Sequence, residues 1–123
     1  GDVNQIIIME TFALAASLNL DMNLLLEVLR SASANSRQLE RIGPKLLARD
    51  FGNQTSHLYG HHVNQLRTRW LSEQVGLQVP LRELAEVYWE QAIEAGFSAS
   101  DPLESIKMIE AQNGVIVSGE TSN

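Results

Sequence analysis

Three histidines lie within six residues of one another in the stretch HLYGHHVNQLRTRW, which spans residues 57–70. On a helix, His57 and His61 would project to the same side, and two imidazoles at this spacing can bind a metal ion. No carboxylate lies on that face, and the stretch lacks the glutamate of an HExxH motif. We therefore expect no metal site and interpret the face as a solvated or interdomain polar surface.

The same stretch has an apolar stripe when it is projected as a helix at about 100° per residue. Four side chains fall within about 60° of one another, which predicts that the stripe faces the core. His61 lies nearly opposite the stripe, beside Asn64. Gly60 leaves two interpretations open, because it permits close approach by a backbone or ligand but also fits a helix that begins only at His61. The stripe consists of Tyr59, Val63, Leu66 and Trp70.

Helical patterns cover nearly the whole chain. The first segment, at 4–18, lacks Pro and Gly and is rich in Ala, Leu, Ile and Met. Gly76 is the expected left-handed cap of the longest helix, and Asp101-Pro102 marks the start of the last one. No alternating strand pattern precedes Gly114, so the predicted fold is an all-α bundle of about six helices. The further helices are expected at 22–32, 36–42, 56–75, 81–95 and 101–113.

Local signals also predict where one helix breaks and which faces are buried. Asn35 and Gln38 resemble a capping box that opens the short helix at 36–42. Gly43-Pro44 should interrupt that helix, which resumes as a turn or two at 45–49. Apolar spacing predicts two further core faces. These are Leu24, Leu25, Val28 and Leu29 in one helix, and Leu81, Leu84, Ala85, Tyr88, Ala92 and Ala95 in another.

The ends of the sequence suggest a piece of a longer protein. Residue 1 is Gly, and strongly apolar helical sequence begins by residue 6. We interpret 1–113 as a helical domain cut from a longer chain. We expect 114–123 to be a flexible tail, in which VIV is either a stray apolar patch or a partner-binding strand.

Composition excludes several classes of function. The 123 residues carry a net charge of -6 with no basic stripe, which argues against nucleic-acid binding. The chain has no cysteine, so disulfides, a thiolate nucleophile and cysteine-bound metals are excluded, and a cytoplasmic location fits. No apolar run approaches the roughly 20 residues needed to span a bilayer, so we expect no membrane contact.

Few other residues suggest chemistry. Glu10 lies among apolar residues, and we interpret it as a buried carboxylate with a structural partner rather than a catalytic one. The loop SASANS contains Ser33, Asn35 and Ser36, which either form a hydroxyl-rich ligand loop or satisfy a helix N-terminus. Motifs such as GxGxxG, a P-loop or GxSxG are absent. The residues alone therefore specify no reaction.

A longer block resembles a known family. Residues 20–52, LDMNLLLEVLRSASANSRQLERIGPKLLARDFG, are similar to the helical C-terminal domain of the 3-hydroxyisobutyrate dehydrogenase family, which is related to 6-phosphogluconate dehydrogenase. The order is Leu-Asp, an LLLEVL-like helix, a small-residue loop, Leu-Glu, Gly-Pro, a Leu pair and Asp-Phe. VGLQVPL at 75–81, AGF at 95–97 and DPLESIKMI at 101–109 extend the resemblance.

The resemblance implies a two-domain enzyme. Its members join an N-terminal Rossmann domain, which binds NAD or NADP, to an all-α domain that covers the active-site cleft and builds a homodimer. The implied reaction is hydride transfer between a 3-hydroxy acid and the cofactor, with a lysine of a Lys-x-x-Asn-Asn motif as general acid/base. No cofactor is expected to bind the present chain alone.

The sequence departs from this family pattern at the lysine. One register places Asn4 and Gln5 on the Asn pair and Gly1 where the lysine belongs. Aligning on Glu10 without a gap moves the lysine upstream of the chain. The only lysines are Lys45 and Lys107, outside that helix. A second family feature, a Lys-Asp pair on the long helix, is replaced by Val63-Asn64 or Asn64-Gln65.

The leading interpretation is the substrate and dimerisation domain of an NAD(P)-dependent 3-hydroxyacid dehydrogenase-like enzyme, inactive by itself. Its partners would be a second copy and the Rossmann domain of the same chain. The alternative is a stand-alone, non-catalytic helical module derived from such a domain, and a third interpretation is a small-ligand-binding bundle. The residues expected to face substrate or cofactor are Asn4, Gln5, Ser33, Asn35, Ser36, His61 and Asn64.

Overall fold

The computed structural model of the chain describes residues 1–52 and 56–120. These residues contain six α-helices, one 3-10 turn and no strand, which confirms the predicted all-α fold. None of the described helices is long and apolar enough to cross a membrane. The helices are α1 (Asp2–Ser17), α2 (Met22–Arg30), α3 (Arg37–Leu47), α4 (Leu58–Val75), α5 (Pro80–Glu94) and α6 (Ile106–Asn113), with the 3-10 turn η1 (Pro102–Ser105) leading into α6.

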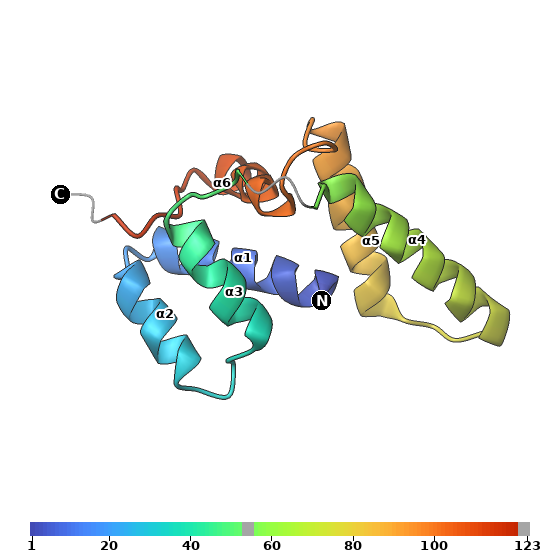
Figure 1. The fold of residues 1–123 in the computed structure, drawn as a ribbon, viewed down its shortest axis with the longest axis horizontal. Coiled ribbons are helices and arrows are strands. Elements are labelled where there is room, and N and C mark those ends of the chain that lie inside the picture. Colours follow the sequence, from blue (N-terminus) through green and yellow to red (C-terminus); the bar gives the residue numbers. More distant parts are fainter. Residues whose placement is uncertain (53–55, 121–123) are drawn as a thin grey trace.

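The helices form two groups that meet at α1. α1, α2, α3 and α6 make a small bundle, and α4 and α5 form an antiparallel hairpin that projects from one side of it (Figure 1). α1 packs against α2, α3, α5 and α6, so it contacts both groups. The hairpin is therefore tied to the bundle mainly through α1 and α5.

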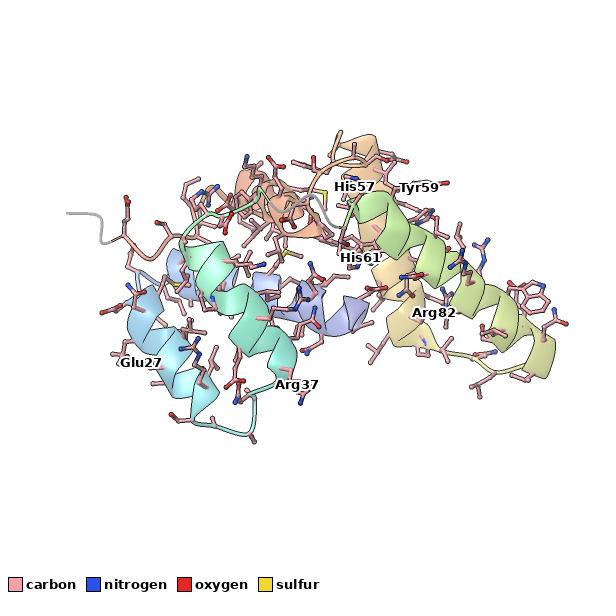
Figure 2. All side chains as sticks on the ribbon, viewed as in Figure 1. Glu27, Arg37, His57, Tyr59, His61 and Arg82 are labelled. Carbon is pink, nitrogen blue, oxygen red and sulfur yellow. The ribbon has the colours of Figure 1, made fainter. Side chains whose placement is uncertain are left out.

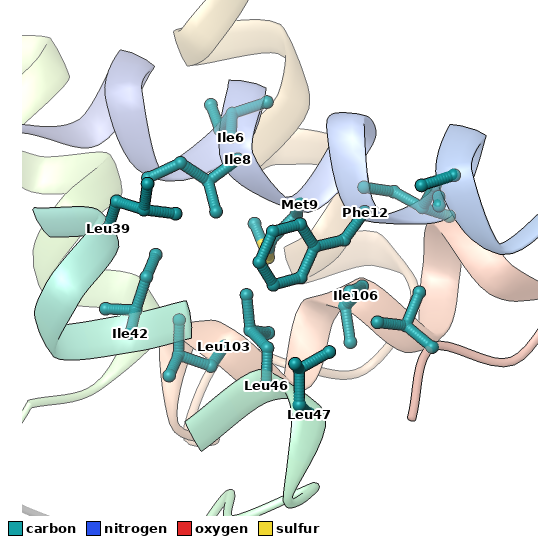
Figure 3. Packing of buried hydrophobic residues seen from close by; sticks show 14 of the residues in the cluster. Ile6, Ile8, Met9, Phe12, Leu39, Ile42, Leu46, Leu47, Leu103 and Ile106 are labelled. Atoms are coloured by element: carbon teal, nitrogen blue, oxygen red, sulfur yellow. The ribbon is translucent and has the colours of Figure 1, made fainter. Parts of the chain in front are cut away.

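The hydrophobic core lies between α1, α3 and α6 (Figure 3). Met9 and Phe12 of α1 are fully buried there, opposite Leu46 of α3 and Ile106 of α6. Burying an apolar side chain of this size stabilises a fold by about 1.5–3 kcal/mol. The central position of α1 in the core thus explains the apolar sequence of residues 6–16.

Side-chain caps define where several helices begin. Asp21 accepts hydrogen bonds from the backbone of Asn23 and Leu24 at the start of α2. Asp101 accepts from Leu103 N at 3.0 Å, which confirms the predicted helix start, although the first turn is 3-10. Gly76 ends α4 with φ 67°, the predicted left-handed cap.

The predicted Asn35–Gln38 capping box is wrong. Ser36 is the N-cap of α3, and its hydroxyl accepts a hydrogen bond from Leu39 N at 3.0 Å. Asn35 instead lies one residue earlier and donates to Glu40. Serine and asparagine are about equally good N-caps, so the sequence alone did not separate the two neighbours.

The predicted interruption at Gly43-Pro44 is also wrong, because α3 runs through both residues. Pro44 removes one backbone donor, but the buried side chains before and after it hold α3 against the core. Gly43 serves close packing: a Cβ there would lie 2.7 Å from Leu26 Cδ1 of α2. The glycine therefore marks the contact between α2 and α3.

The predicted core face of α4 is wrong. Tyr59 and Trp70 are 55% and 60% exposed, whereas Leu58 and Gln65 are buried and His61 is half-buried. α4 packs only against α5 over most of its length, so a two-helix hairpin leaves one of its faces uncovered. Periodicity identified an apolar stripe but not whether a neighbouring helix covers it.

Periodicity has the same limit for the predicted core faces of α5 and α2. On α5, Ala85, Trp89 and Ala92 are buried, but Leu81 and Leu84 are each 66% exposed. On α2, the buried residues are Met22 and Leu26, while Leu24 and Val28 are exposed. The predicted core face was therefore half right for α5. On α2 it was wrong for Leu24 and Val28.

Gly60 lies within α4, which begins at Leu58 rather than at His61. A Cβ at Gly60 would meet no other atom within 4 Å, so no close approach of another backbone explains it either. The later helix start and the close approach of another backbone are therefore wrong for the described residues, whereas close approach by a ligand stays a prediction.

The packed chain continues beyond Asn113. Residues 114–120 form no helix or strand, but Val117 is fully buried. Arg49 donates to the Val117 carbonyl at 2.8 Å and to Glu110 at 2.7 Å, and Glu110 accepts from Val117 N. Hydrogen bonds and burial thus attach this segment to α3 and α6. Its predicted flexibility stays a prediction, and 121–123 lie outside the described residues.

This attachment predicts a contrast between two neighbouring residues. Val117→Ala should lower the free energy of unfolding by about 2 kcal/mol, because it removes buried carbons from the core. Ile116→Ala, at a residue that is 66% exposed, should change it by less than about 0.5 kcal/mol. Urea unfolding followed by circular dichroism measures both values, and equal effects would contradict the burial of Val117.

Candidate functional site

A partly buried cluster of polar side chains joins α1 to α4. Asp2, in the first turn of α1, receives one contact on each carboxylate oxygen. His61 Nδ1 lies 2.6 Å from Oδ1, and Gln65 Nε2 donates to Oδ2 at 2.8 Å. His61 and Gln65 are four residues apart on α4 and therefore share one face. We call Asp2, His61 and Gln65 the Asp2 cluster.

The imidazole of His61 is held on three sides. Its ring centroid lies 5.3 Å from that of Trp89, which is fully buried in α5. Its Nε2 lies 3.3 Å from the hydroxyl of Ser56. Figure 2 shows His61 on the inner side of α4 and Tyr59 on the outer side. His61 therefore faces α1 and α5, so the solvated alternative for this polar face is wrong, whereas the interdomain alternative stays a prediction.

The carboxylate of Asp2 sets the protonation pattern of the ring. An ionised carboxylate only accepts hydrogen bonds, so the contact at Nδ1 requires a hydrogen on that nitrogen. In the neutral imidazole, Nε2 then carries the free lone pair. This arrangement leaves Nε2 as the atom that can take up or release a proton.

Burial alone would raise the pKa of the Asp2 carboxyl, since it disfavours the charged form. The hydrogen bonds from His61 and Gln65 lower it, together with the positive charges of His61 and the chain's amino terminus. The net result is a pKa of Asp2 below its ordinary value. Asp2 is thus kept ionised by the α4 side chains that contact it.

A second set of polar contacts lies between α1 and α3. Asn4 donates to the Ser36 hydroxyl at 3.2 Å, and Gln38 donates to Gln5 Oε1 at 3.3 Å. The structure thus brings Asn4, Gln5 and Ser36 of the predicted set together beside Asp2. Ser36 also caps α3, so its hydroxyl has a structural task.

The remaining candidates are dispersed. Ser33 and Asn35 are exposed in the α2–α3 loop, and within 1–52 and 56–120 no hydrogen bond links either of them to His61 or Asn64. Glu10 is exposed, so its predicted burial is wrong. α1 turns that side chain away from the core while Met9 faces inward.

Two cavities border His61. The larger, about 690 Å³, opens beside α4 and is lined by Ser56, His61, Asn64 and Arg67, among others. The smaller, about 90 Å³, lies between His61, Ser56 and α3. Arg67 forms no ion pair with any residue that the structure describes. The larger cavity is therefore lined by a guanidinium without an ion-pair partner among the described residues and by the His61 side chain.

The histidine pair considered at the outset does not converge. His57 precedes α4, and its Nδ1 lies 3.0 Å from the carbonyl oxygen of Ala99, whereas His61 turns toward Asp2. Among residues 1–52 and 56–120, no three His, Cys, Asp or Glu side chains are grouped so as to hold a metal ion. The rings of His57 and His61 therefore contact different groups.

Three residues of this region were missed in the sequence. Asp2 gave only the signal of an acid in a first helical turn, which normally complements the helix dipole. Gln65 was considered only as part of a family register, and Trp89 could be interpreted from the sequence only as a core or interface aromatic. The contact between α1 and α4 spans about 60 residues of sequence, as the separation of 59 between Asp2 and His61 shows, and no local pattern encodes it.

The lowered pKa of Asp2 predicts how stability depends on pH. Its stabilising contribution is present above the unfolded pKa, near 3.8, and is lost as pH falls through the lower folded value. Asp2→Asn should therefore cost about 1–2 kcal/mol at pH 7, and this difference from the parent chain should shrink below pH 3.8. Urea unfolding across pH 7 to pH 2, roughly the range of this linkage, measures it.

Asp50→Asn is the matched control, because Asp50 is exposed and makes only a 3.4 Å contact with Gly52 N. Its effect on the free energy of unfolding should stay below about 0.5 kcal/mol at every pH. A cost of Asp2→Asn that is constant or grows toward acid would contradict the assigned ionisation.

Comparisons with known proteins agree with this architecture. The crystal structure of a 3-hydroxyisobutyrate dehydrogenase from Salmonella typhimurium is similar, with a TM-score of 0.80 and 20% sequence identity over 87% of this chain. At that identity the likeness concerns the fold. The chain spans only 37% of the length of that enzyme. No curated protein sequence matches it.

A family model covers most of the sequence. It is described as "NAD-binding of NADP-dependent 3-hydroxyisobutyrate dehydrogenase" and matches residues 2–109. The matched range contains all six helices except the end of α6, and it includes every member of the Asp2 cluster. The chain therefore belongs to the family of NAD-binding domains of NADP-dependent 3-hydroxyisobutyrate dehydrogenase.

Proposed function

We propose that this chain is the C-terminal substrate and dimerisation domain of an NAD(P)-dependent 3-hydroxyacid dehydrogenase-like oxidoreductase, and that it is inactive by itself. The observation that carries the proposal is the Asp2 cluster beside the open cavity of about 690 Å³. Under this proposal the nucleotide-binding domain precedes Gly1. It would then join the chain within one residue of Asp2, whose carboxylate contacts His61, a residue that lines that cavity. A cytoplasmic location belongs to the same proposal and is supported by the absence of cysteine.

The residues at this cavity fit part of a nucleotide cofactor or an acidic substrate. Arg67 can bind one phosphate or carboxylate group, and Asn64 can add a neutral hydrogen bond. No glycine-rich turn at a helix start is present to cradle a diphosphate. A bound nicotinamide would supply hydride acceptance, while this chain would supply groups that orient and cover the reactants.

The positions of the two lysines support the proposal that catalysis depends on groups outside this chain. Lys107 lies on α6 and pairs with Glu104 at 2.9 Å, and Lys45 belongs to α3. Neither is on α1, where the family resemblance would require it. The alternative, a stand-alone helical module without catalysis, draws its support from the same absence. The sequence upstream of Gly1 separates the two, since a βαβ unit with a glycine-rich turn favours the enzyme and a start codon favours the module.

The proposal predicts a difference between the isolated and the extended chain. The 123-residue chain, mixed with NAD⁺ or NADP⁺ and a panel of 3-hydroxy acids, should give no change in absorbance from reduced nicotinamide. The chain extended by its preceding nucleotide domain should turn over at least one of them. Turnover by the isolated chain would contradict the proposal, as would an extended chain that binds no dinucleotide in calorimetry.

Homodimer formation is the second part of the proposal. Large apolar side chains on α1, α4 and α5 are more than half exposed, and contiguous exposed apolar surface marks association sites. Several of them lie on the uncovered faces of the α4–α5 hairpin described above. They include Ile7, Leu14, Tyr59, Trp70, Leu71, Leu81 and Leu84.

We expect the chain to elute in size-exclusion chromatography with light scattering at twice its 13.6 kDa mass. Leu84→Glu should shift the equilibrium to monomer, because it would bury a charge in the interface. Ala34→Glu adds the same charge at an exposed residue of the α2–α3 loop, outside α1, α4 and α5, and should leave the dimer intact. A parent chain that stays monomeric at micromolar concentration would count against the proposal.

A further inference from the structure

We propose that the ends of α2, α3 and α6 form a binding site for an extended peptide, and that residues 117–119 of the same chain are its ligand. The site consists of Asn23, Leu47, Arg49 and Glu110, and we call it the tail site. It shares no residue with the Asp2 cluster and does not depend on the proposed dehydrogenase function. The ligand segment also lies beyond residues 2–109, which the family model matches.

An ion pair holds both backbone groups of Val117. Glu110 Oε2 accepts a hydrogen bond from Val117 N at 2.7 Å, and Arg49 Nη1 donates to the Val117 carbonyl at 2.8 Å. Arg49 and Glu110 also contact each other twice, at 2.7 and 3.0 Å, so each fixes the orientation of the other. Hydrogen bonds to charged groups are stronger than those between neutral groups. The pair therefore binds the backbone of one extended residue firmly.

The side chains of the segment alternate between buried and exposed. Val117 is fully buried, whereas Ile116 is 66% exposed and Ser118 is half-buried. In an extended chain successive side chains point to opposite sides, so only every second one enters the protein. Val117 enters the hydrophobic core cluster. The tail site therefore selects an apolar side chain at this one position.

Two residues later the tail site selects glycine. Gly119 N donates to the Leu47 carbonyl at 2.8 Å, and Asn23 Nδ2 donates to the Gly119 carbonyl at 2.7 Å. A Cβ at Gly119 would lie 3.1 Å from Asn23 Oδ1 and 3.3 Å from Leu47 Cβ. A side chain there would press against Leu47 and disturb both hydrogen bonds. The preferred ligand is thus an apolar residue followed, two positions later, by glycine.

These contacts follow the logic of peptide recognition by strand addition. In that mode, main-chain hydrogen bonds give affinity, and pockets for alternate side chains give specificity. Here the main-chain hydrogen bonds come from the ends of helices. Leu47 is the last residue of α3, and a helix leaves its last carbonyls without an intrahelical donor. An extended segment satisfies that carbonyl and links α3 to α2 and α6.

The bound segment is bordered by open space on another side. Cavities of about 750 and 400 Å³ are both lined by Ile116 and Ser118 of the segment and by Ala16 and Asn19 at the end of α1. Because space rather than a described helix lies there, the segment can leave without moving a helix. It therefore acts as a tethered ligand that latches α2, α3 and α6 together while it is bound.

The first test adds the ligand as a separate peptide to the full 123-residue chain. The probe is the fluorescein-labelled peptide GVIVSGE, residues 114–120, followed by fluorescence anisotropy. In Val117→Asp the chain's own segment should leave the site, because a carboxylate does not enter an apolar pocket. This variant should bind the probe saturably and about tenfold or more tightly than the parent, whose tethered segment competes at a roughly millimolar effective concentration.

Ile116→Asp is the matched control, since it adds the same charge at the preceding, exposed residue. Its own segment should stay bound, so it should take up the probe as weakly as the parent. Arg49→Ala, combined with Val117→Asp, should weaken probe binding about tenfold or more. A probe with Gly119→Val should lose binding to a similar extent, and one with Ile116→Ala should keep it. No saturable binding to folded Val117→Asp, or equal binding of the Gly119→Val probe, would overturn the proposal.

The second measurement uses the unmodified chain and decides the question even where Val117→Asp does not fold. Native-state hydrogen exchange reports how often each backbone amide opens. The amides of Val117 and Gly119 should share one protection factor, measurable but about tenfold or more below that of Phe12 in the core. Protection equal to that of Phe12 would mean that the segment opens only with the whole bundle, and no protection would mean that it is not held. Either result overturns the proposal, and protection that rises with chain concentration would do so too, because the ligand would then come from a second copy.

Discussion

At the junction between the bundle and the α4–α5 hairpin, the partly buried carboxylate of Asp2 requires hydrogen bonds from α4. Burying part of a charged group costs free energy unless hydrogen bonds replace water. Both replacements for Asp2 come from α4, through His61 and Gln65, so the carboxylate is satisfied only when α4 lies against the start of α1. Trp89, buried behind His61, adds apolar contact to the same junction. One ionised side chain thereby couples the bundle to the hairpin.

The same coupling explains why the hairpin leaves so much apolar surface uncovered. The face of α4 that meets the body of the protein is partly polar, since it must serve Asp2. Its apolar stripe, with Tyr59 and Trp70, is therefore turned outward. A two-helix projection cannot cover both sides of either helix. The site and the proposed dimer surface are thus two consequences of one orientation of α4.

Much of the fold could be predicted from local sequence, and most of the site could not. Asp21, Asp101 and Gly76 act through neighbours within a few residues, so their caps were recognisable. The break expected at Gly43 failed because contact with Leu26 of another helix decides that position. The partner of His61 was not predicted, and its face was interpreted as solvated or interdomain, because an isolated helix contains no information about Asp2, 59 residues away. Periodicity left more than one face of a helix as the possible buried face. Contacts between residues far apart in the sequence determine which of these faces is buried.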